Sequence, residues 1–166
     1  MRHFLFLLIY IFFLGTASGQ ESLEKVLDRY NSHSIPYISV EELVMFQKTS
    51  NLVILDAREK IEFDVSHIPS AIYIGFDNFT VNDKHLQKLN KDSQIIVSCS
   101  IGIRSEQIGE KLKKAGFTNV KNLYGGIFEW KNKGLRVVDS IGLPTENVHT
   151  YSKKWSKWLR SGNPVY

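Results

Sequence analysis

Residues 94–105, QIIVSCSIGIRS, decide the fold of this chain, because an apolar run, a short loop and the start of a helix follow one another without a gap. The β-branched run 95–97 predicts a buried strand. Apolar residues at helical spacing predict an amphipathic helix over 103–115, which Gly116 ends. Cys99 therefore lies at the carboxyl end of a strand and directly before a helix. In parallel sheets ligands bind at the carboxyl ends of the strands.

The same alternation of strand-like and helix-like segments runs through the whole chain. Ser39 and Glu42 form a capping box, which predicts a helix through Gln47. The predicted strands are 37–38, 52–55, 71–74, 94–98 and 120–123, and the other predicted helices are 21–31, 58–64, 83–89 and a short helix after Gly125-Gly126 that holds Trp130. Connections this short predict right-handed βαβ units. We therefore predict an α/β fold with a mainly parallel sheet covered by helices on both faces.

Cys99 is the only cysteine of the 166 residues, so an internal disulfide is excluded. For an arbitrary lone cysteine, burial as a small apolar side chain is the default interpretation. The loop argues otherwise, because a tight turn there can aim backbone N–H groups at one point and the following helix N-terminus adds partial positive charge. This field favours the thiolate over the thiol. Gly102 allows a close backbone approach, and Arg104 can offer a charged fork to an oxyanion.

Three groups of residues resemble motifs of the rhodanese-like sulfurtransferases, in the family's order and at its spacing. The loop Cys99–Ser105 matches C-x-x-G-x-R-S. Upstream, Asp56–Glu59 and Ser66–Ile72 match D-x-R-E and G-H-I-P-x-A, and downstream Leu112–Val120 and Leu123–Trp130 match L-x-x-x-G-[FY]-x-x-V and L-x-G-G-[IW]-x-x-W. The resemblance covers residues 37–134 and identifies the chain as similar to a single-domain, exported member of the family.

The resemblance implies the rhodanese fold, a five-stranded parallel sheet with helices on both faces, and a cysteine that cycles through a persulfide. Cys99 would take sulfur from a donor such as thiosulfate and pass it to a thiophilic acceptor, either cyanide or a thiol that could belong to a protein. No cofactor is implied. The predicted substrate-binding residues are Ser100, Ile101, Gly102, Ile103 and Arg104, and the predicted supporting residues are Asp56 and Arg58.

The sequence departs from the family pattern at two places. Ser66 stands where the family has a glycine before the histidine, which should disturb only a local turn. Ser100 and Ile101 are uncharged, whereas the thiosulfate-type loop commonly carries basic residues at these positions. Arg104 and the backbone N–H groups must therefore bind an anion largely alone, so a donor other than thiosulfate stays open.

Three other functions compete with sulfur transfer. Phosphatases of this fold separate their cysteine and arginine by five residues, but four residues separate Cys99 from Arg104, and position 105 is serine. A Cys/His hydrolase needs a histidine beside the thiol, and the resemblance makes the candidate, His67, a structural residue. The remaining histidines have no close-spaced ligand partners, so no metal site is predicted. The last alternative is a non-catalytic binding or sulfur-relay module in the cell envelope, against which the retained cysteine argues.

The ends of the chain predict export and two extensions. Basic residues precede the apolar run 4–14, and small residues follow it, which is typical of a secretory signal peptide at 1–19 that is too short to span a bilayer. Cleavage after Ala17 and cleavage after Gly19 both stay open. The remaining residues, 43% apolar over the full length, suit one domain. We predict an N-terminal helical extension at 20–36, a rhodanese-like domain at 37–138 and a C-terminal extension at 139–166, in a periplasmic or secreted protein.

The C-terminal extension carries a predicted basic aromatic helix around Trp155 and Trp158. Its aromatic side chains either pack on the domain, which we favour, or contact anionic lipid or a partner. The formal net charge of +4 is otherwise spread along the chain. That charge is too weak to predict nucleic-acid binding, and no stable membrane span is expected after the signal is cleaved.

Overall fold

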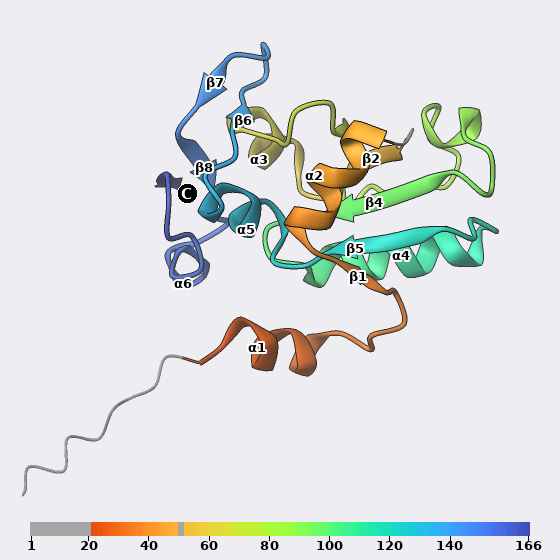
Figure 1. Cartoon of the computed structure of the whole chain (residues 1–166), viewed down its shortest axis with the longest axis horizontal. Coiled ribbons are helices and arrows are strands. Elements are labelled where there is room, and N and C mark those ends of the chain that lie inside the picture. The colour runs from red at the N-terminus through yellow and green to blue at the C-terminus, as the bar shows by residue number, and fades with distance from the viewer. Residues whose placement is uncertain (1–20, 50–51) are drawn as a thin grey trace, which may run out of the picture.

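The central feature of the molecule is a parallel sheet of five strands in the order β1-β5-β4-β2-β3 (Figure 1). The computed structural model describes residues 21–49 and 52–166, so the predicted signal peptide lies outside the described residues. The strands are β1 (Tyr37–Ile38), β2 (Leu52–Asp56), β3 (Ile72–Tyr73), β4 (Gln94–Ser98) and β5 (Val120–Leu123). All four strand pairings are parallel. This confirms the predicted five-stranded α/β fold.

Helices cover both faces of the sheet. Successive side chains of a strand point to opposite faces, and here both sets are apolar and need a covering layer. On one face Ile54 and Ile96 join a core cluster that includes Leu43 and Phe128. Those two residues come from α2 (Val40–Thr49) and α5 (Gly126–Asn132). On the other face the neighbouring strand residues join a second cluster with Ile108 of α4 (Ile103–Lys114) and with the 3₁₀ helix η1 (Leu86–Lys88). The prediction of helices on both faces is therefore confirmed.

Local capping explains where the helices begin. The backbone N–H of Ser39 donates to the Glu42 carboxylate at 2.9 Å, and the Glu42 N–H donates to the Ser39 hydroxyl at 3.1 Å, which confirms the capping box before α2. The helix predicted at 58–64 is shifted to α3 (Lys60–Val65). The helix predicted at 83–89 is only the three-residue η1, because the Asp83 carboxylate accepts the His85 N–H and forms a local turn instead.

The N-terminal extension lies against the domain through α1 (Leu23–Tyr30), whose Val26 and Leu27 are buried. The C-terminal extension forms two small pairings. Its β7 (Pro144–Thr145) pairs with β6 (Val137–Val138) at the end of the domain, and its β8 (Asn147–His149) pairs with β9 (Asn163–Val165). Between β8 and β9 lies α6 (Lys153–Ser156). The predicted basic aromatic helix is thus only four residues long, because the chain turns back to pair β9 with β8.

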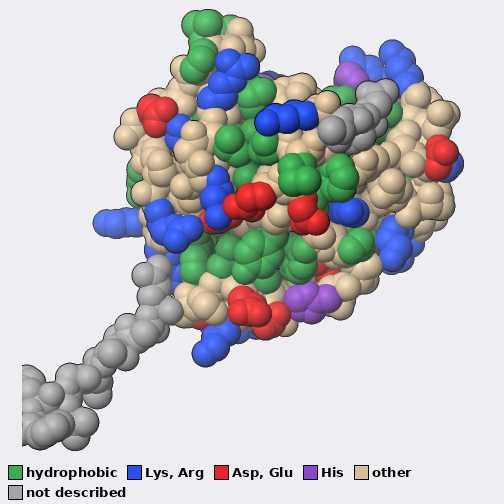
Figure 2. Space-filling model, viewed as in Figure 1, with side chains coloured by type: hydrophobic (Ala, Val, Ile, Leu, Met, Phe, Trp, Pro, Cys, Tyr) green, Lys and Arg blue, Asp and Glu red, His purple; other side chains and the backbone are tan. Residues whose placement is uncertain are grey.

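The two tryptophans of the C-terminal extension pack on the domain. Trp155, Trp158 and Leu159 are partly buried against the core cluster that contains Phe128. On the face seen in Figure 2, hydrophobic side chains are interspersed with basic and acidic ones. No helix within 21–49 and 52–166 is long and apolar enough to cross a membrane.

Candidate active site

Cys99 lies directly after β4 with its sulfur at the centre of a tight loop. Its side chain is buried, with 1% of the residue surface exposed. The Gly102 backbone N–H donates to Sγ at 3.1 Å, and the Ser105 hydroxyl lies 3.3 Å from the same atom. Gly102 caps the N-terminus of α4 with φ = 113°, a left-handed conformation that favours glycine. The loop therefore directs the Gly102 N–H toward the sulfur, as an anion requires.

Two asparagine side chains anchor this loop from elements far apart in the sequence. The Nδ2 groups of Asn122 and Asn31 donate to the Gly102 carbonyl oxygen at 2.8 and 2.9 Å. The Ser105 hydroxyl donates to Asn122 Oδ1 at 2.7 Å, so β5 also orients the hydroxyl that faces the sulfur. Neither asparagine is predicted from the sequence, because only their contacts in the folded protein distinguish them from other asparagines.

The N-terminus of α5 supports the loop from its other side. The N–H groups of Ile127 and Phe128 donate to the carbonyl oxygens of Cys99 and Ser100 at 2.9 and 3.2 Å. Gly126 makes this approach achievable, because a Cβ on it would lie 2.2 Å from the Cys99 carbonyl oxygen. Gly126, the first residue of α5, is therefore the residue that allows this helix to contact the cysteine loop.

The predicted supporting residues Asp56 and Arg58 form a buried ion pair. Arg58 Nη2 lies 2.7 Å from Asp56 Oδ2, and the two side chains are 0% and 1% exposed. The same Nη2 donates to the Ser66 carbonyl oxygen at 2.6 Å. This pair connects the end of β2 to the segment after α3. It supports the architecture beside the loop, and no contact of either side chain with Cys99 is recorded among the described residues.

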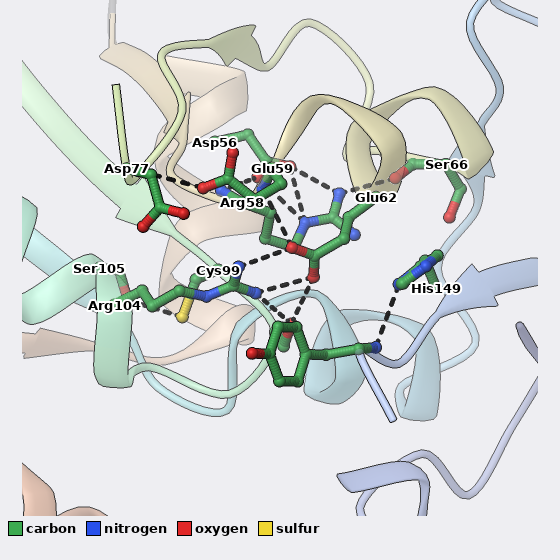
Figure 3. A network of polar contacts seen from close by, with 12 residues as sticks. Asp56, Arg58, Glu59, Glu62, Ser66, Asp77, Cys99, Arg104, Ser105 and His149 are labelled. Carbon is green, nitrogen blue, oxygen red and sulfur yellow. Dashed lines mark hydrogen bonds and ion pairs between the residues drawn. The ribbon is translucent and has the colours of Figure 1, made fainter. Parts of the chain in front are cut away.

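Arg104 points to a carboxylate rather than standing free over the loop. Its Nη1 and Nη2 donate to Glu62 Oε2 and Oε1 at 2.6 and 2.7 Å, and Nη2 also donates to the Ser100 hydroxyl at 2.9 Å (Figure 3). Burial raises the pKa of Glu62, but the hydrogen bonds and charge of Arg104 outweigh burial and hold this pKa below its ordinary value. For Arg104, burial is likewise outweighed by Glu62 and by Cys99, which hold its pKa above the ordinary range.

The Glu62 pairing refines the prediction that Arg104 binds an anion largely alone with the backbone. Most of the guanidinium's charge is already balanced inside the protein. Glu62 follows Glu59 at the spacing of a capping box, and the Glu59 N–H does donate to Glu62 Oε2 at 3.0 Å. That spacing predicts a helix start at α3 and nothing about Arg104, so the sequence offered no signal for this contact.

A pocket of about 280 Å³ opens beside the cysteine. Four of the predicted loop residues line it together with Cys99, and the backbone of the fifth, Gly102, reaches the sulfur. Two lining residues, Tyr151 and Trp155, come from the C-terminal extension, and the Tyr151 ring lies 5.6 Å from Arg104 Cζ. The lining residues are Glu59, Phe76, Asp77, Cys99, Ser100, Ile101, Ile103, Arg104, Tyr151 and Trp155. The contribution of the extension was not predicted.

His67 and His149 make contacts within the fold and neither lines the pocket beside Cys99. The His67 ring stacks on Phe63 with centroids 3.9 Å apart, and its Nδ1 lies 3.0 Å from the Phe63 carbonyl oxygen. His149 is buried, its Nδ1 accepts the Tyr151 N–H at 3.1 Å, and burial lowers its pKa. Within residues 21–49 and 52–166, no group of three or more His, Cys, Asp or Glu side chains could hold a metal ion.

The parallel sheet and the anchored cysteine loop at the end of β4 define an α/β protein with a rhodanese-type site. The model of the rhodanese-like domain matches residues 39–133. Because this match covers more than half of the chain, the chain belongs to the rhodanese-like domain family. Membership supports sulfurtransferase-type activity in general.

Individual relatives are similar over the same region. The chain is 33% identical over 128 residues to the putative sulfur carrier protein YrkF of Bacillus subtilis, covering 73% of this chain and 68% of that one. It is 31% identical over 111 residues to the tRNA uridine(34) hydroxylase of Legionella pneumophila, covering 65% of this chain and 43% of that one. The crystal structure of a rhodanese-related protein from Thermoplasma volcanium matches with a TM-score of 0.53 and 29% identity, covering 62% of this chain and 97% of that chain.

Proposed function

We propose that this protein is a sulfurtransferase that carries sulfane sulfur as a persulfide on Cys99. The observation that carries the proposal is the environment of the Cys99 sulfur. It accepts a hydrogen bond from the Gly102 N–H, lies 3.3 Å from the Ser105 hydroxyl and stands at a pocket wide enough for a small substrate. A donor placed in this way stabilises a negatively charged sulfur, both as the attacking thiolate and as the persulfide anion.

The proposed reaction proceeds in two displacements. The Cys99 thiolate attacks the outer sulfur of the donor, the S–S bond of the donor breaks, and the leaving group departs with the bonding electron pair. With thiosulfate as donor this leaving group is sulfite. A thiophilic acceptor, cyanide or a thiol, then attacks the outer sulfur of the persulfide, and Cys99 departs as the thiolate. The Gly102 N–H stabilises the negative charge on the Cys99 sulfur when it attacks and when it departs.

The same site supports a second candidate, a sulfur relay that exchanges its sulfur only with a partner protein. The observation that favours it is the pairing of Arg104 with Glu62, which leaves the loop without an unpaired cation for a small anionic donor. From the predicted signal peptide we propose that the protein acts outside the cytoplasm, as a periplasmic or secreted protein. The proposed partners are a small sulfur donor and a thiophilic acceptor, which in the relay is a protein thiol.

Mass spectrometry of the intact protein tests the proposal directly. Wild type incubated with thiosulfate or an organic persulfide should gain the mass of one sulfur atom, and cyanide should remove it as thiocyanate. The gain reports on Cys99 because the chain has no other cysteine. Cys99→Ser should gain nothing, and Ser93→Ala, before β4 and therefore at the opposite end of that strand, should load as wild type. Equal sulfur release from wild type and Cys99→Ser would refute the proposal.

A further inference from the structure

The pocket beside Cys99 carries more negative than positive charge. Among its lining residues Glu59 and Asp77 are acidic, and Arg104 is the basic one. Arg104 is already paired with Glu62, whose side chain is 2% exposed. Neither Glu59 nor Asp77 takes part in an ion pair within the described residues. The lining therefore presents two carboxylates whose charge no neighbouring cation balances.

Figure 3 shows where these two carboxylates lie relative to the sulfur. Asp77 and Glu59 stand on the same side of the Cys99 loop, and the Asp77 N–H donates to Glu59 Oε1 at 3.1 Å. Asp77 is exposed, and its carboxylate has no hydrogen-bond partner recorded among residues 21–49 and 52–166. Lys111 lies beside the lining, with its Nζ 5.7 Å from the Phe76 ring centroid. It contacts an aromatic face of the wall and neither carboxylate.

The rest of the wall is apolar and aromatic. Phe76, Tyr151 and Trp155 contribute ring surfaces, and Ile101 and Ile103 contribute aliphatic ones. Such a wall binds the carbon skeleton of an organic molecule, and ring faces also attract a cation. A small inorganic dianion gains nothing from this wall and is repelled by both carboxylates.

From this combination we propose that the sulfur donor is the persulfide of a small aminothiol, R–S–SH with an ammonium group on R. The inference rests on the proposed persulfide chemistry at Cys99 and names the donor class for it. The Cys99 thiolate attacks the outer sulfur of R–S–SH, the S–S bond breaks, and the aminothiol leaves as R–S⁻ and takes up a proton. Cys99 retains the outer sulfur as a persulfide. No oxidant or reductant is consumed, because the outer sulfur is transferred from one thiol, that of the donor, to another, that of Cys99.

The ammonium group is the part of the donor that the two carboxylates recognise. With the outer sulfur of the donor beside the Cys99 sulfur, the aminoalkyl chain lies along the aromatic wall and its ammonium faces Asp77 and Glu59. Because Asp77 is exposed, its attraction is a screened interaction that mainly raises the rate of productive encounter. Loading of Cys99 should therefore depend on the sign of the donor's charge.

The test compares three persulfides R–S–SH whose R groups differ in charge: cysteamine, with a cationic R, 2-mercaptoethanol, with a neutral R, and 3-mercaptopropionate, with an anionic R. The rate of sulfur gain on Cys99 is measured by mass spectrometry at low salt for wild type, Asp77→Asn and Asp92→Asn. Asp92 is an exposed acidic residue in the turn before β4, at the opposite end of that strand from Cys99. Its substitution changes the net charge of the protein by the same amount as Asp77→Asn. Dividing the rates of wild type and variant for one donor cancels that donor's intrinsic reactivity.

Asp77→Asn should slow loading by the cationic cysteamine persulfide about threefold, speed loading by the anionic 3-mercaptopropionate persulfide about threefold and leave the neutral donor unchanged. Asp92→Asn should change none of the three rates, and high salt should remove the Asp77 effect. If Asp77→Asn leaves the cysteamine persulfide rate unchanged while all three donors load wild type, the donor class is refuted and the persulfide function stands. If no donor, thiosulfate included, loads wild type, the proposed function fails and the donor class with it.

Discussion

Gly126→Ala is the substitution whose effect can be worked out most directly from the structure. At φ = +54° an L-residue is strained by about 1–2 kcal/mol. The added Cβ would lie 2.2 Å from the Cys99 carbonyl oxygen and 2.7 Å from the carbonyl carbon and oxygen of Ser100. These are backbone atoms, which cannot rotate away as a side chain can, so the loop must shift, at a further cost of about 1–3 kcal/mol. We expect Gly126→Ala to lower the free energy of unfolding by about 3 kcal/mol.

Gly134→Ala, just beyond the C-terminus of α5, is the matched control. Gly134 has a similar left-handed backbone, with φ = +75°, but no atom lies within 4 Å of its added Cβ. This variant should therefore lose only the backbone strain, about 1 kcal/mol. Urea denaturation measures the unfolding free energy of both variants. We expect Gly126→Ala to be less stable than Gly134→Ala by about 2 kcal/mol, the cost of the contact with the cysteine loop.

The same pair of variants links the contact to activity. Gly126→Ala should slow sulfur loading of Cys99, because the carbonyl oxygen that must move belongs to the cysteine itself. Gly134→Ala should load at the wild-type rate. If the two variants are equally stable and load equally fast, α5 does not hold the loop in the way that the structure indicates.

Two further predictions concern side chains that the fold brings to the loop. Glu62→Gln should lower the free energy of unfolding near neutral pH by about 2 kcal/mol, because it leaves the Arg104 charge unbalanced. Since the folded-state pKa of Glu62 is lowered, its stabilising effect is complete above the ordinary value of 4.5 and is lost as the pH falls through the lowered pKa. The variant should therefore lose less stability than wild type in acid urea titrations, and parallel curves would contradict this. Tyr151→Ser should reduce kcat/KM for sulfur transfer about fivefold with little change in Tm, because it removes a pocket wall. Tyr166→Ser, which does not line the pocket, should match wild type; equal activity of both variants would exclude a role for Tyr151.

Much of the fold could be predicted because its signals are local. The apolar run 95–97 predicts a buried strand wherever it stands in the fold, and the Ser39 capping box marks a helix start within four residues. Helix bounds are predicted less well where a polar side chain can form a hydrogen bond with a nearby backbone group in place of the helical one. At 83–89 the Asp83 carboxylate accepts the His85 N–H, so the expected helix shortens to η1.

The candidate site divides in the same way. The loop around Cys99 could be predicted, because its donors come from the backbone of the next few residues. The partner of Arg104 could not, because Glu62 lies 42 positions away in the sequence and meets it only when α3 packs beside the loop. The sequence predicts that the tryptophans of the C-terminal extension pack on the domain, but no local pattern indicates that Tyr151 and Trp155 line the pocket.

The sequence by itself determined that Cys99 stands at the end of a strand in a parallel α/β fold, within a loop whose own backbone can stabilise a sulfur anion. Local hydrophobic periodicity and loop composition suffice for that conclusion. Only the tertiary structure decided what surrounds the sulfur: the paired charge of Arg104, the unbalanced carboxylates of Glu59 and Asp77, and the aromatic wall. These features arise from side chains on separate elements, and the packing of those elements, which no local pattern records, sets the charge and shape of the pocket.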